Sequence, residues 1–288
     1  ASVRAPHEWF RPASRHRQAR CRLWFPELMP IPFETLSWLE IVVVVVAYVF
    51  GFYVRGSFGF GSNLPIVLIT AWFLGALDAV LLVSVVATFA QVQLLPQGVR
   101  DANWKRAIPM VLTMMVGGAV GVWLLRTMSA DWLLLVLGLI VGVMMVTERM
   151  NLLVHLGRFI DVRASRVTAT LGCVSSVAGT LAGGGTMYLL VPFLRIAADS
   201  PAEFRSTNMM VAGLSTMIRI VMLSFAGLVS LELLVDALVL WPVTVVAALA
   251  GGHFFRTSSP ERFFFALQRM MMVAAVLLVI KGILVLMG

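Results

Sequence analysis

The stretch GTLAGGGT, residues 179–186, interrupts an apolar run that covers residues 167–194 without a charged side chain. Each glycine costs a helix roughly 1 kcal/mol relative to alanine, so the consecutive glycines favour a break. A bilayer offers no water to a freed backbone, which is tolerated at membrane depth only where protein buries it or where it lines a wet cavity. A helix starting at Thr186 would point its free N–H groups at the break, as in an anion site. Close helix packing through Gly179 and Gly183 explains the same glycines, and this stretch alone favours neither interpretation.

A second interruption lies in the first half of the chain. Residues 55–63 read RGSFGFGSN and precede a short apolar piece, residues 64–69. Each half therefore holds a glycine break followed by a short apolar segment with a proline, Pro65 or Pro192. Paired interruptions at matching places in two halves point to the binding site of a transporter.

The composition is that of a multi-span helical membrane protein. Hydrophobic residues make up 60% of the 288 residues and charged residues 12%, which is about half the charged share of a soluble domain. The net charge is +8, but the arginines lie mostly between apolar runs, so they fit membrane loops rather than nucleic acid. The cysteines and histidines show no ligand spacing, and no catalytic motif is found, so we expect no enzyme activity, no metal and no cofactor.

The apolar runs divide the chain into four parts. Residues 1–35 form a basic arm that we expect to be disordered or dispensable, because Met29 opens a stretch that reads as a natural start. A first transmembrane repeat covers residues 36–148, a basic connector residues 149–166, and a second repeat residues 167–288. With about five segments each, an odd number, the repeats would be inverted relative to each other.

Each repeat has its expected helical segments. They are residues 36–54, 63–77, 79–95, 107–125 and 132–147 in the first repeat, and 167–181, 186–196, 206–226, 233–251 and 262–287 in the second. Two GxxxG patterns, at residues 117–121 and 138–142, predict helix-packing faces. The arginine-rich loops predict a cytoplasmic side at residues 100–106, 149–166 and 256–262, and the tight turns at residues 126–131 and 227–230 would then lie outside.

Four motifs resemble the TauE/SafE family of sulfite exporters, a family of anion permeases. They are Gly59-Phe60-Gly61 with Pro65, Gly179 and Gly183-Gly184-Gly185 with Pro192, NWKRA at residues 103–107, and SSPER at residues 258–262. The resemblance covers about residues 36–288. It implies two inverted repeats and transport of sulfur-containing or organic anions, without fixing the anion. The small polar element Ser206-Thr207-Asn208 of the second half has an apolar counterpart in the first, so the site is expected to be lopsided.

Arg219 is the sharpest candidate, because it lies in an otherwise uncharged helix. A charge at membrane depth costs at least about 2.5–3.5 kcal/mol on insertion scales and marks a functional site by default. We expect its guanidinium to neutralise a bound anion; a structural pair with Asp236 is the alternative. Arg55 lies beside the first break, where it either joins the site or reaches the membrane interface. The predicted substrate-binding residues are Gly59, Gly61, Ser62, Asn63, Gly183, Gly184, Gly185, Thr186, Thr207, Asn208, Arg219 and Arg55.

These observations predict an all-α polytopic membrane protein with glycine-broken helices at its centre. The expected function is a permease for a small anion such as sulfite, an organosulfonate or a related organic anion, in the bacterial inner membrane. A passive anion channel and a non-transporting membrane scaffold are the alternatives, and a scaffold needs neither a buried arginine nor paired breaks. The expected partners are the anion, the lipid bilayer and a second copy in a homodimer, with no nucleic acid. Asp236 is the candidate for proton coupling.

Overall fold

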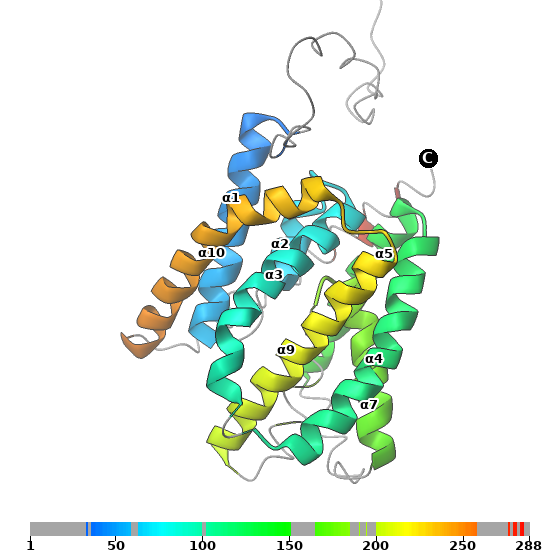
Figure 1. Ribbon diagram of the computed structural model, residues 1–288. Helices are drawn as coiled ribbons and strands as arrows, with labels where there is room; N and C mark the ends of the chain where they lie inside the picture. The colour runs from blue at the N-terminus through cyan, green and yellow to red at the C-terminus, as the bar shows by residue number, and fades with distance from the viewer. Residues whose placement is uncertain are drawn as a thin grey trace, which may run out of the picture. The chain divides into compact units, whose positions relative to one another are not determined.

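Helices make up all the regular structure in the described part of the chain, as the computed structural model shows (Figure 1). The structure describes residues 33, 36–58, 63–99, 102–150, 165–184, 190, 194 and 200–257, and the single positions 276, 279, 280, 283 and 284. The helices are α1 (Trp38–Phe58), α2 (Asn63–Thr70), α3 (Ala76–Gly98), α4 (Trp104–Thr127), α5 (Ala130–Arg149), α7 (Ser165–Leu181), α9 (Pro201–Phe225) and α10 (Leu231–Thr257).

Four of these helices are long and apolar enough to cross a membrane. The spans are Trp38–Gly56, Trp104–Thr127, Ser206–Phe225 and Leu231–Gly251, and shorter apolar helices cover Ala76–Val92 and Ala130–Val143. The 24 residues of α4 extend about 36 Å, enough for a hydrocarbon core of roughly 30 Å. The prediction of an all-helical multi-span protein is confirmed.

The helices begin and end close to the predicted segments, with one clear difference. The segment predicted at residues 63–77 is helical only to Thr70; a turn follows, and α3 starts at Ala76 after Gly75, whose φ of 86° favours glycine. α9 begins earlier than predicted, because the Ser200 side chain accepts the N–H of Glu203 at 3.1 Å and caps the helix ahead of Pro201. The basic arm except Phe33, the connector at residues 151–164 and most of residues 186–196 and 262–287 lie outside the described residues.

Two helix pairs approach until their backbones touch. Gly56 of α1 faces the backbone of Ala248 on α10, and Gly117 of α4 faces the backbone of Cys173 on α7, so closely that neither glycine leaves room for a Cβ. Glycine at these positions permits the close approach of small-residue membrane interfaces. The predicted packing face at residues 117–121 is confirmed. The second, at residues 138–142, was wrong for Gly142, because a Cβ there would meet nothing within 4 Å.

The helix pairs match two by two. α1 packs on α10 as α7 packs on α4, α3 packs on α10 as α9 packs on α4, and α3 packs on α9. An inverted repeat that exchanges the two halves would produce this set of pairs. The repeat itself, and the division of the chain at residues 149–166, stay predictions.

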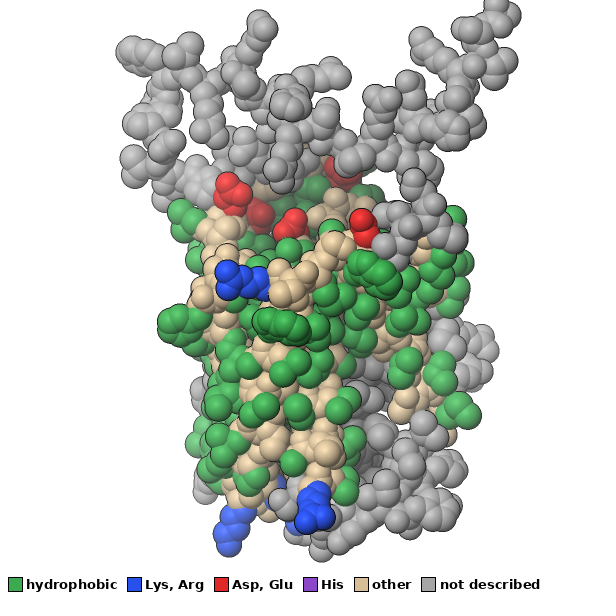
Figure 2. Space-filling view, turned by 90° about the vertical axis from the view of Figure 1, so that its right-hand side faces the viewer, with side chains coloured by type: hydrophobic (Ala, Val, Ile, Leu, Met, Phe, Trp, Pro, Cys, Tyr) green, Lys and Arg blue, Asp and Glu red, His purple; other side chains and the backbone are tan. Residues whose placement is uncertain are grey.

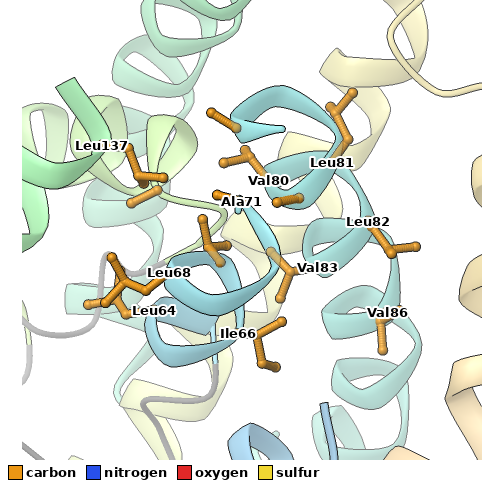
Figure 3. Packing of buried hydrophobic residues seen from close by; sticks show 14 of the residues in the cluster. Leu64, Ile66, Leu68, Ala71, Val80, Leu81, Leu82, Val83, Val86 and Leu137 are labelled. Carbon is orange, nitrogen blue, oxygen red and sulfur yellow. The ribbon is translucent and has the colours of Figure 1, made fainter. Parts of the chain in front are cut away.

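The core lies around α2, which is buried on nearly all sides. Its residues are buried except for the half-buried Ile69, and its aliphatic side chains pack with those of α3 and with Leu137 of α5 (Figure 3). Gly183, which follows α7, lies against the same helices: a Cβ there would stand 2.5 Å from Val83 Cγ1 and 3.0 Å from Val67 Cγ2. The second glycine break therefore sits in the core of the first half.

The charges separate along the helices. On the face in Figure 2, a hydrophobic surface separates Asp and Glu side chains at one end from Lys and Arg at the other, with a further basic side chain on the acidic side. The turns that connect α4 to α5 and α9 to α10 lie at one common end (Figure 1), and the starts of α4 and α9 meet at the opposite end, where Arg106 pairs with Glu203 at 3.6 Å. This arrangement agrees with the predicted loop placement; the basic end as the cytoplasmic side stays a prediction.

Candidate functional site

The second glycine break begins as a helix cap. The N–H of Gly184 donates to the carbonyl of Gly179 at 2.5 Å, and the N–H of Gly183 donates to the carbonyl of Thr180 at 3.4 Å. This bond pair, with Gly183 at φ 67°, is the Schellman motif that ends helices. Gly184 has φ 108°, again a conformation for glycine. The glycines are therefore required by the backbone conformation as well as by close packing.

Residues from both halves converge on this cap. Asn63, at the start of α2, donates from Nδ2 to the carbonyl oxygen of Gly183 at 2.5 Å. A Cβ on Gly184 would lie 2.5 Å from Asn63 Nδ2 and 2.7 Å from both Nη atoms of Arg219. The structure thus brings together four predicted site residues: Asn63, Gly183, Gly184 and Arg219. Gly59, Gly61, Ser62, Gly185 and Thr186 lie outside the described residues.

Arg219 is buried without a matching negative charge in the described part of the chain. The residue is 6% exposed, and Nη1 lies 3.5 Å from the Gly179 carbonyl oxygen. Among the described residues, Nε and Nη2 have no hydrogen-bond partner and no ion pair joins Arg219 to Asp236. Asp236 Oδ1 accepts the N–H of Phe33 at 2.9 Å instead. The alternative of a structural Arg219–Asp236 pair is wrong for the described structure, in which no carboxylate offsets the cost of the buried guanidinium.

Arg55 is also directed inward. Its Nη2 donates to Gln91 Oε1 on α3, its guanidinium lies 5.8 Å from the centre of the Phe52 ring, and its Nε has no partner among the described residues. Gln91 in turn donates from Nε2 to the carbonyl of Met209 on α9 at 3.2 Å. Arg55 therefore belongs to the interior rather than to the membrane interface.

Thr207 and Asn208 lie apart from this convergence. Thr207 Oγ1 accepts the N–H of Asn103 at 2.9 Å, which ties the start of α9 to the start of α4. About twelve helical residues, or roughly 18 Å of α9, separate it from Arg219. Asn208 Oδ1 is buried without a partner in the described structure. The predicted site residues therefore form a group at the glycine cap and a second group nearer the basic end.

Sequence reasoning missed a small pocket that Arg219 helps to line. It holds about 10 Å³, room for one water molecule. Its walls come from α4, α7 and α9, and they are Met114, Met115, Gly118, Ser176, Thr180, Ser215, Ile218, Arg219 and Met222. The sequence does contain the serine, threonine and glycine residues of this wall. They could not be recognised as one site, because the sequence does not show that α4, α7 and α9 are neighbours.

One comparison with known proteins identifies a family. A family model described as sulfite exporter TauE/SafE matches residues 43–281. Neither a curated protein nor a solved structure matches the chain. The matched region includes both glycine breaks, Arg55 and Arg219, and it agrees with the multi-pass helical architecture described above. The chain belongs to the sulfite exporter TauE/SafE family of membrane transporters.

Proposed function

We propose that this protein is a permease that carries a small anion through a site formed by Arg219, Asn63 and the glycine cap at Gly183 and Gly184. The anion is sulfite, an organosulfonate or a related organic anion, and the membrane is the bacterial inner membrane. The observation that carries the proposal is the buried guanidinium of Arg219, with Nε and Nη2 unpaired among the described residues.

An anion at this place offsets the unfavourable burial of Arg219. It supplies the negative charge that is missing beside Arg219 among the described residues, and a guanidinium binds sulfonate or carboxylate oxygens as a two-pronged donor. Gly184 supports the role, because the missing side chain leaves the guanidinium and the Asn63 amide in direct contact with the cap.

Transport in proteoliposomes tests the proposal. Labelled sulfite and labelled small organosulfonates are measured for uptake by the native protein and by Arg219→Gln. Arg126→Gln is the matched control, because Arg126 is an exposed arginine in the last turn of α4. We expect saturable transport that is lost with Arg219→Gln and retained with Arg126→Gln. Equal transport by both variants would exclude Arg219 from the site, and flux that never saturates would favour a passive channel.

A further inference from the structure

The pocket behind Arg219 is an unassigned site directly connected to the proposed anion position. Arg219 forms part of its wall, and the Nη atoms of the same side chain lie against Gly184. An anion held by the guanidinium would therefore lie near both the glycine cap and this pocket. In an organic anion, the part of the molecule attached to the charged group would then lie next to the pocket.

The pocket offers few hydrogen bonds besides those of Arg219. Ser176 donates its hydroxyl hydrogen to the Met114 carbonyl at 2.6 Å, and Ser215 donates to the Ala212 carbonyl at 3.1 Å. A hydroxyl has only one hydrogen to donate, so neither serine has one left for an anion. The Thr180 hydroxyl is a further polar group of the wall, and most of the rest consists of methionine and isoleucine side chains. This surface suits hydrocarbon better than charged oxygen atoms.

A missing side chain creates part of the space. A Cβ on Gly118 would lie 3.3 Å from Ser176 Oγ and 3.7 Å from Met222 Sδ. The present volume of about 10 Å³ holds only a water molecule. Methionine is unbranched and has three rotatable bonds, so Met114 and Met222 can rotate to enlarge the space.

We propose that the pocket binds the hydrocarbon part of an organic anion whose sulfonate or carboxylate group pairs with Arg219. The preferred substrate is then a short-chain organic anion rather than inorganic sulfite. This inference rests on the proposed function, because it needs an anion at Arg219. It assigns chain-length selectivity to Gly118 and Met222. Both line the pocket, and a Cβ on Gly118 would lie 3.7 Å from Met222 Sδ.

Binding of a chain-length series tests the proposal. The purified full chain is titrated with sulfite and with methane-, ethane-, propane- and butanesulfonate, and dissociation constants are measured by calorimetry. We expect affinity to increase about fourfold for each added methylene group that becomes buried, until the pocket is full. A flat series, with sulfite binding that still depends on Arg219, overturns the inference and leaves the proposed function intact. Binding of every probe that is unchanged in Arg219→Gln overturns both.

Two variants test where the chain binds. Gly118→Ala places a methyl group in the pocket, and we expect it to abolish the gain from ethane- to butanesulfonate while sulfite affinity changes less than about twofold. Met222→Ala enlarges the pocket, so the best chain length increases. Gly142→Ala is the matched control, because a Cβ there meets nothing within 4 Å. If both pocket variants keep the native chain-length profile, as the control does, the hydrocarbon binds elsewhere and the inference is wrong.

Discussion

Asn63 donates a hydrogen bond to the carbonyl oxygen of Gly183, although the residues are 120 positions apart. Asn63 is the first residue of α2, and Gly183 belongs to the cap that ends α7. The ends of the two glycine breaks are therefore in direct contact, as expected if both belong to one site. The two interruptions that the sequence places in matching positions therefore approach each other at Asn63, Gly183 and Gly184, while residues 59–62, 185 and 186 lie outside the described residues.

Asn63→Asp tests whether a negative charge beside Arg219 competes with the bound anion. The carboxylate keeps the shape of the amide but stands beside the Nη atoms of Arg219, which approach the same point at Gly184. We expect it to pair with the guanidinium and to weaken sulfite binding at least tenfold. Calorimetric titration measures the effect. Asn63→Ala is the comparison, because it removes the amide without adding charge; unchanged sulfite affinity in Asn63→Asp would contradict the prediction.

Gly184→Ala will displace Arg219. The new methyl group meets Asn63 and the guanidinium at 2.5–2.7 Å and is held at φ 108°. We expect the free energy of unfolding to fall by more than the roughly 1–3 kcal/mol that backbone strain alone costs. Chemical denaturation in detergent provides the measurement. Gly75→Ala is the matched control, since Gly75 has φ 86° but open space around it. An equal fall in the free energy of unfolding in both variants would mean that backbone strain, and not the clash with Asn63 and Arg219, causes the destabilisation.

Arg219→Gln and Asp236→Asn should behave differently. Loss of a charge-assisted pair worth about 1.5–3 kcal/mol raises the dissociation constant of the bound anion on the order of 10–100-fold. Asp236→Asn should leave that constant unchanged, because no ion pair joins Asp236 to Arg219 in the described structure, where Asp236 accepts the Phe33 N–H. Ligand-induced thermal shift across sulfite, sulfonates and small carboxylates measures both. Parallel loss of stability in the two variants, with anion affinity retained, would restore the structural-pair interpretation.

Gln91→Leu should destabilise the protein by leaving Arg55 unpaired. Gln91 accepts from Arg55 and donates to the Met209 carbonyl, so it joins α1, α3 and α9. Leaving such a buried group unsatisfied costs about 1–3 kcal/mol, or more for a charged one. The double variant with Arg55→Leu should recover most of this stability, because apolar side chains then replace both partners. Thermal unfolding of the two single variants and the double variant gives the coupling; additive losses would show that the pair contributes nothing.

The sequence predicted the helices better than the site. Apolar runs as long as α1, α4 and α10 have few alternatives in a chain so poor in charge. Arg219 could be recognised as a candidate because it is the charged residue of an otherwise uncharged apolar run. The role of Thr207 was beyond reach of the sequence, because its partner, Asn103, is 104 positions away. Asp236 accepts the N–H of Phe33, which lies 203 positions away. Periodicity and composition carry no information about such pairings.

The two glycine contacts, Gly56 of α1 against α10 and Gly117 of α4 against α7, determine where the chain can be cut. Each joins a helix of the first half to a helix of the second through backbone contact. The contacting pairs, α1 with α10 and α4 with α7, therefore do not correspond to continuous halves of the chain. Two fragments cut between residues 149 and 166 would each lack one member of both pairs, so we expect neither fragment to form these contacts until the two associate.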